Sequence, residues 1–166
     1  SSAPDYETGG EFTMFNAIAV TLHVLAAIIW VGGMFFAVYV LRLAAGALEP
    51  SDRLPLWHRS FTKFFPWVWM AVIVLPVTGY WLVFELHGNM ASLPVPYHIM
   101  HGIGLIMVFI FLHLWFAPYA RFKAALEGEN LPEAAKQLNT MRLLVTTNLY
   151  LGLLNSVIGT TGRFWG

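Results

Sequence analysis

The stretch that decides the fold runs from Phe12 to Leu41 and reads FTMFNAIAVTLHVLAAIIWVGGMFFAVYVL. It contains 30 residues and not one Asp, Glu, Lys or Arg. A helix needs only about 20 predominantly apolar residues to cross the hydrocarbon core of a bilayer. This stretch therefore predicts a membrane-spanning helix, and the same criterion can be applied to the rest of the chain.

Three further stretches lack acidic and basic residues: 64–84, 86–120 and 143–162. The second of these begins with Gly, Asn, Ser and Pro, which is typical of a loop, so we expect its helix to begin near Tyr97. We predict an all-α, integral membrane four-helix bundle with spans at about 15–43, 64–85, 97–124 and 139–161. Pro66 is expected in the first turn of the second helix, where its missing N–H is tolerated.

The predicted bundle occupies residues 14–166 as a single domain. Residues 1–13 (SSAPDYETGGEFT) are polar and acidic, unlike the apolar run that Met14 opens. We interpret this segment as a cloning remnant or a disordered tail.

The composition excludes several classes of protein. Of 166 residues, 58% are hydrophobic and only 11% are charged, whereas soluble domains carry about 25% charged residues. Nine Lys and Arg balance nine Asp and Glu, so no basic field exists to attract nucleic acid. The chain has no cysteine, which excludes disulfides, iron–sulfur clusters, thiolate zinc sites and cysteine nucleophiles.

The basic residues predict the orientation. Eight of the nine lie in or beside the first and third connections: Arg42, Arg53, Arg59, Lys63, Arg121, Lys123, Lys136 and Arg142. Because basic residues collect on the cytoplasmic side, both termini are expected on the non-cytoplasmic side of a bacterial inner (cytoplasmic) membrane, which the chain crosses several times. Trp57 and Trp115 fall near predicted span ends, and we interpret them as part of an interfacial aromatic belt.

Histidines are the informative polar residues, because ionisable groups at membrane depth are costly and usually functional. At about 1.5 Å per residue, His23 and His101 lie at a similar depth on the outer side of the membrane. His98 lies about one turn further out, and His113 lies on the inner side of the midplane. Neutral imidazole binds haem iron, copper and zinc, so these four histidines are the candidate ligands.

Two kinds of metal chemistry suit this set. Two histidines on facing helices of a bundle can clamp a b-type haem, which favours electron transfer. No carboxylate lies inside the predicted bundle, since the charge-free stretches end before Glu85, which argues against a di-iron site. Met90, Met100 and His87 lie close in sequence to the outer histidines, and thioether plus imidazole suits copper.

Two sequence runs resemble a known family. LHVLAAIIWVGGMFF (22–36) and FLHLWFAPYARFKAALEGEN (111–130) resemble the copper-resistance protein D (CopD) family and the related HemJ-type protoporphyrinogen oxidases, as does Asn139 at the expected start of the last helix. The resemblance implies a four-helix core with intramembrane histidines and, for HemJ-type proteins, bound haem b. His23 and His113 match the two family histidines, and His98 loosely matches a third. The resemblance to HemJ-type proteins is incomplete, since this chain has His101 near the sequence position where those proteins have a lysine.

Three functions remain open at this point. The first is a haem b protein in electron transfer or oxidoreduction, with a quinone, superoxide or a porphyrin as partner; a HemJ-like protoporphyrinogen oxidase is the related alternative. The second is a CopD-like copper transport or resistance protein. The third is a non-enzymatic subunit of a larger membrane complex, or of a homo-oligomer. No catalytic residue can be assigned, and if the chain is an enzyme we expect a haem-dependent membrane oxidoreductase.

Overall fold

The computed structural model describes residues 7–165, with side chains from residue 13 onward. Its elements are α1 (Glu7–Phe36), the π-helical turn η1 (Ala37–Leu41), α2 (Arg42–Ala45), α3 (Pro50–His87), the 3-10 turn η2 (Met90–Ser92), α4 (Val95–Leu114), the π-helical turn η3 (Trp115–Tyr119), α5 (Ala120–Glu127), α6 (Leu131–Thr161) and the 3-10 turn η4 (Gly162–Phe164). Over the described range there is no strand, and the predicted all-α fold is confirmed.

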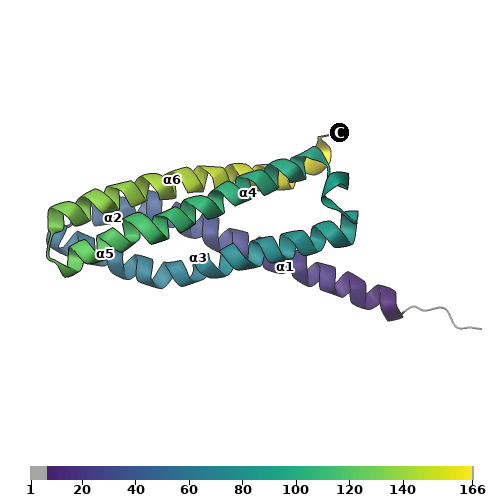
Figure 1. The fold of residues 1–166 in the computed structure, drawn as a ribbon, viewed down its shortest axis with the longest axis horizontal. Coiled ribbons are helices and arrows are strands. Elements are labelled where there is room, and N and C mark those ends of the chain that lie inside the picture. Colours follow the sequence, from purple (N-terminus) through teal and green to yellow (C-terminus); the bar gives the residue numbers. More distant parts are fainter. Residues whose placement is uncertain (1–6, 166) are drawn as a thin grey trace, which may run out of the picture.

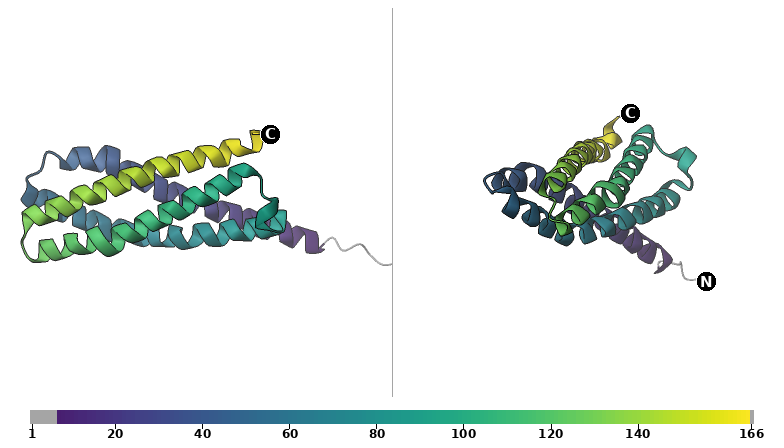
Figure 2. Two further views of the ribbon diagram at one scale, coloured as in Figure 1. Left: turned by 45° about the horizontal axis from the view of Figure 1, so that its top comes forward. Right: turned by 60° about the vertical axis from the view of Figure 1, so that its left-hand side comes forward.

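Four long helical segments run alongside one another (Figures 1 and 2). Each is long and apolar enough to cross a membrane: Thr13–Ala45, Pro50–His87, Val95–Glu127 and Leu131–Phe164. The predicted four-helix membrane architecture is therefore confirmed. We call the end with η2 and the C-terminus the terminal end, and the end with the α5–α6 connection the arginine end.

The first, second and last helices begin earlier than predicted. The second was expected near residue 64 but begins at Pro50, so Pro66 lies inside α3 rather than in its first turn. The last was expected near residue 139 but begins at Leu131, after Asn130, whose side chain accepts a hydrogen bond from the Glu133 N–H at 3.1 Å. Asn139 therefore does not open the last helix. Hydropathy detects the apolar part of a helix, whereas these helices continue into basic segments.

The N-terminal segment is only partly described. Helix α1 begins at Glu7, so its first turns lie within residues 1–13. Residues 1–6 lie outside the described range.

The bundle consists of two closely packed helix pairs. α1 packs along α3, and α4 packs along α6, which also contacts α1 and α3. The backbones of α3 and α4 lie apart, although only the short η2 segment separates these helices in the chain, and long side chains bridge them, as Phe65 and Phe111 do (Figure 1). Helix α6 is therefore the element whose backbone approaches both pairs.

Aromatic side chains fill the arginine half of the bundle. The Phe65 ring stacks on Phe61 with centroids 5.0 Å apart and meets Phe111, Trp115 and Tyr119 edge-on. Edge-on and stacked aromatic pairs contribute stability beyond their buried area.

The interfacial-belt interpretation was wrong for Trp57. Its side chain is 2% exposed, inside the bundle. Trp57 faces inward because α3 begins 14 residues before the predicted span, so this turn of the helix packs against the core.

Candidate metal site

His23 is held in one orientation by helix α3. Its Nδ1 atom lies 2.8 Å from Oγ1 of Thr78, which is buried. The single hydroxyl proton of Thr78 is engaged with the Val74 carbonyl oxygen at 2.6 Å. Because a hydroxyl has one proton to donate, His23 donates its Nδ1–H to Thr78, which leaves the lone pair on Nε2. This neutral tautomer can bind a metal ion.

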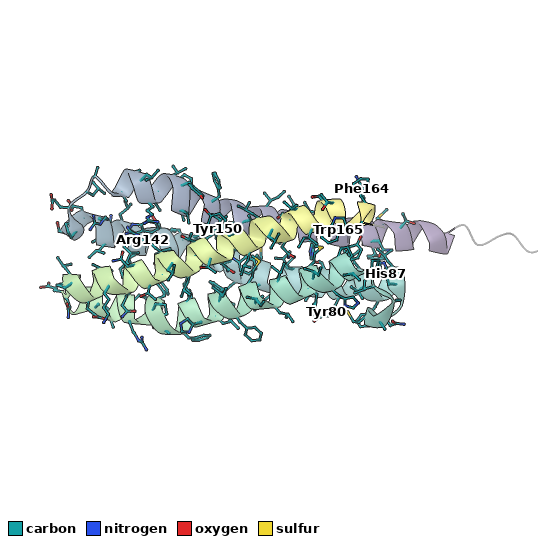
Figure 3. All side chains as sticks on the ribbon, turned by 90° about the horizontal axis from the view of Figure 1, so that it is seen from above. Tyr80, His87, Arg142, Tyr150, Phe164 and Trp165 are labelled. Atoms are coloured by element: carbon teal, nitrogen blue, oxygen red, sulfur yellow. The ribbon has the colours of Figure 1, made fainter. Side chains whose placement is uncertain are left out.

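His101 is also bonded to α3, on a different residue. Its Nε2 atom lies 2.6 Å from the Tyr80 hydroxyl, and the two rings are 5.5 Å apart. Figure 3 places Tyr80 near the terminal end of the bundle. A metal ion bound at Nε2 would have to displace this hydrogen bond, while Nδ1 makes none among the described residues.

The two histidines lie at one level of the bundle but on different sides of α3. Thr78 and Tyr80 are two residues apart, which is a rise of about 3 Å and a rotation of about 200°. This agrees with the similar depth expected for His23 and His101. A haem clamped by two histidines needs both imidazoles to face one macrocycle, and the observed arrangement does not fit that requirement. Within the described range, no three His, Cys, Asp or Glu side chains gather into a metal-binding group.

The other candidate ligands lie elsewhere. His98 and His113 are on α4 with exposed side chains. His87 ends α3, where its ring lies 5.9 Å from that of Tyr97. Met90 begins η2 at the same end of the bundle. Among the described residues, the outer histidines therefore do not form a metal-binding group.

Two methionines instead meet at the centre of the bundle. Met34 of α1 and Met107 of α4 are both buried, and both side chains end at Gly152 of α6. A Cβ atom on Gly152 would lie 3.0 Å from the Met107 Cε and 3.7 Å from the Met34 Cε. The absence of a side chain at Gly152 therefore allows the ε-methyl ends of methionines from two helices to converge there.

A third methionine contacts the same helix nearer the terminal end. A Cβ atom on Gly159 would lie 3.4 Å from the Met100 Sδ and 2.9 Å from its Cε. Gly152 and Gly159 are seven residues apart, so they share one face of α6 about 10 Å from each other. Met100 precedes His101, so thioether and imidazole lie next to each other in the chain on α4.

Two asparagines lie on the same face of α6. Asn148 donates its side-chain N–H to the Met107 carbonyl oxygen at 3.2 Å. The Oδ1 atoms of Asn148 and Asn155 are buried and have no hydrogen-bond partner in the described structure. Buried acceptors without a partner cost about 1–3 kcal/mol each and call for an explanation. We call Asn148, Gly152, Asn155 and Gly159, together with Met34, Met100 and Met107, the α6 stripe.

The sequence alone does not reveal the α6 stripe. Methionine is usually a packing residue, and its role depends on which face of each helix it occupies. The spacing of the asparagines and glycines on α6 was the signal that could have drawn attention to this face.

Comparison with known proteins gives one result. The family model of Copper resistance protein D matches residues 58–161, which cover α3 from its third turn through the end of α6. No curated protein and no solved structure matches the chain. Since the match spans more than half of the chain and includes most of the α6 stripe, this multi-pass membrane protein belongs to the copper resistance protein D family.

Proposed function

We propose that this protein binds Cu(I) inside the membrane, as part of a copper transport or resistance function. The observation that carries this proposal is that the side chains of two buried methionines, Met34 and Met107, bring their Cε ends together at Gly152. Cu(I) is a soft ion that prefers thioether and imidazole ligands, so a buried pair of methionines suits it better than it suits harder ions. The family match supports copper as the ion.

The surroundings of the methionine pair also suit a cation. The Oδ1 atoms of Asn148 and Asn155 are buried acceptors without partners, and their negative ends favour positive charge nearby. Asn148 also lines a small cavity with Met34 and Trp30. A cation in this part of the bundle would be stabilised by groups that are otherwise unsatisfied.

The terminal end supplies the approach to this site in our proposal. His101 and Met100 are neighbours on α4, and His98 is exposed one turn away. Together with His23, these residues would take up copper from the side on which both termini lie. His113 lies on the opposite side of the methionine level on α4, where it would bind copper during release from the protein. The basic residues at the arginine end favour the cytoplasm for that end.

Copper retention by the purified full-length chain tests the proposal. The protein in detergent is loaded with Cu(I), kept reduced with ascorbate, and separated from free metal by gel filtration. The double variant Met34→Leu/Met107→Leu replaces both thioethers with apolar side chains of similar volume, which cores tolerate. Met70→Leu is the matched control, because Met70 is on α3 with 36% of its side chain exposed.

We expect wild type and Met70→Leu to retain copper, and the double variant to retain at least tenfold less. Equal retention by all three proteins would overturn the proposal. Thermal unfolding of each variant without copper checks that the fold is kept. If the double variant is unstable, the single variants are compared with Met70→Leu in the same way.

Electron transfer through haem b is the second candidate. The shared level of His23 and His101 and the Nε2 lone pair of His23 favour it. The placement of the two imidazoles on different sides of α3 argues against it. Absorption spectra of the oxidised and dithionite-reduced protein, purified from cells with ample haem, distinguish the two. Copper binding predicts no Soret band, whereas a Soret band that is lost in His23→Ala and His101→Ala would favour haem.

A further inference from the structure

At the arginine end, no acidic side chain among the described residues lies within 4.0 Å of Arg42, Arg53 or Arg142. Arg42 of α2, Arg53 of α3 and Arg142 of α6 come together there, and the charges of Arg42 and Arg53 act on the Arg142 guanidinium. Among the described residues, the ion pair within 4.0 Å joins Lys136 and Glu133, away from these three arginines. Three like charges at one place are unfavourable unless an anion joins them.

The Arg142 guanidinium lies over an indole ring. Its Cζ atom is 5.2 Å from the centroid of the Trp57 ring, which is a cation–π arrangement. Its Nη1 atom lies 3.4 Å from the Asn139 Oδ1. In Figure 3, Arg142 lies between the beginning of α6 and the segment that contains α2 and the beginning of α3. The Trp57 ring and the Asn139 side-chain amide hold the Arg142 guanidinium in one orientation, and neither group neutralises its charge.

Three of the unsatisfied polar atoms in this region are hydrogen-bond donors, and a fourth, the His58 Nδ1 atom, can donate or accept. The Nε atoms of Arg53 and Arg142 and the Nε1 atom of Trp57 are buried, and none has a partner in the described part of the chain. Arg53 and Trp57 are four residues apart, so they share one face of α3. On α6, by contrast, the unsatisfied atoms of Asn148 and Asn155 are acceptors. A cluster of unsatisfied donors calls for an anion with several acceptor oxygens.

A small pocket lies between these groups. Arg42, Arg142, Trp57 and Thr146 line it, together with Ala37 and Val38 of the π-helical turn η1. A π-helical turn widens a helix locally and is frequent at functional sites. The pocket is thus bounded by arginines from two helices, with the Arg53 charge close by.

We propose that Arg42, Arg53 and Arg142 form a binding site for a phosphate-type oxyanion, with Trp57 as its floor. Guanidinium groups bind phosphate oxygens through two parallel hydrogen bonds, which the arrangement of three arginines would provide. The phosphate can belong to an anionic lipid headgroup at the membrane surface or to a soluble molecule. The site is independent of the methionine pair, which lies nearer the centre of the bundle.

Thermal unfolding of the full chain in detergent tests the site and its source of phosphate. Phosphatidylglycerol, phosphatidylcholine and inorganic phosphate are added in separate arms, and the unfolding temperature is followed by tryptophan fluorescence. Arg142→Gln and Arg53→Gln remove one charge each. Arg121→Gln is the matched control, because it removes an exposed charge on α5 at the same end. Arg42→Gln, at an exposed position, serves if the other variants fail to fold.

We expect phosphatidylglycerol, but not phosphatidylcholine, to raise the unfolding temperature of wild type and Arg121→Gln. The rise should be at least halved in Arg142→Gln, Arg53→Gln and Arg42→Gln. A rise with inorganic phosphate alone, lost in the same variants, would support the site and identify a soluble ligand. Equal rises in all variants, or equal effects of the two lipids with no response to inorganic phosphate, would overturn the proposal.

Discussion

The side-chain N–H of Asn148 donates a hydrogen bond to the backbone carbonyl oxygen of Met107 at 3.2 Å, which ties α6 to α4 at the level of the methionine pair. The same asparagine leaves its Oδ1 atom buried without a partner in the described structure. The Asn148 side chain therefore does two things: its N–H bonds to the backbone of Met107, and its Oδ1 remains an acceptor without a partner.

Asn148→Leu should change the stability of the protein little. The variant loses one hydrogen bond, which is about 1 kcal/mol, and removes an unsatisfied buried oxygen that costs about 1–3 kcal/mol. We expect the free energy of unfolding in detergent to stay within about 1 kcal/mol of wild type. A loss of several kcal/mol would show that Oδ1 has a partner in the native protein.

Gly152→Ala should destabilise the bundle where the methionines meet. The added Cβ would lie 2.8 Å from the Val31 Cγ2 and 3.0 Å from the Met107 Cε. Overpacking of this kind costs about 1–3 kcal/mol. Gly102→Ala is the control, because a Cβ there meets nothing within 4 Å. Helix propensity alone should make that variant about 0.5–1 kcal/mol more stable. Denaturant titration of both proteins measures the difference, and a neutral Gly152→Ala would mean that the stripe is loosely packed.

The apolar architecture could be predicted from the sequence, whereas the helix ends could not. Charge-free stretches located all four helices, because the bilayer imposes a minimum apolar length. The same criterion missed residues 50–63, where Leu54, Trp57 and Phe61 pack into the bundle from a helix whose other face is polar and basic. Hydropathy averages over both faces and so underestimates the length of such a helix.

The candidate site was only partly predictable for a related reason. Counting residues along each helix gave the shared level of His23 and His101, because depth depends on helix rise alone. Direction depends on how each helix is rotated about its axis, which requires the packing partners. The sequence therefore could not show that Met34 and Met107 face Gly152, or that Arg53 and Trp57 face Arg142.

Thr78→Val should release His23 from its fixed orientation. Valine keeps the shape of threonine but cannot accept the Nδ1–H of His23. We expect a loss of about 0.5–1.5 kcal/mol in unfolding free energy, since hydrogen bonds between membrane helices are of modest strength. Thr78→Ser keeps the hydroxyl and should behave like wild type. If Thr78→Ser loses stability and Thr78→Val does not, the methyl group rather than the hydrogen bond is what matters.

Phe65→Ala should be among the most destabilising single changes in the arginine half. Phe65 is 2% exposed and contacts four other aromatic rings. Truncation of a buried phenylalanine costs about 3–5 kcal/mol. Phe109→Ala is the comparison, because Phe109 is 66% exposed on α4. Thermal unfolding in detergent should rank Phe65→Ala far below Phe109→Ala, and equal unfolding temperatures would contradict the aromatic core described above.

The central claim is that thioethers at the centre of the bundle hold Cu(I), and copper K-edge X-ray absorption tests it most directly. The purified full-length protein is loaded with one equivalent of Cu(I), and the nearest scattering atoms around copper are identified. Our account predicts sulfur neighbours in wild type and in Met70→Leu, and their loss in Met34→Leu/Met107→Leu. A copper environment of nitrogen and oxygen alone, unchanged by the double substitution, would contradict it.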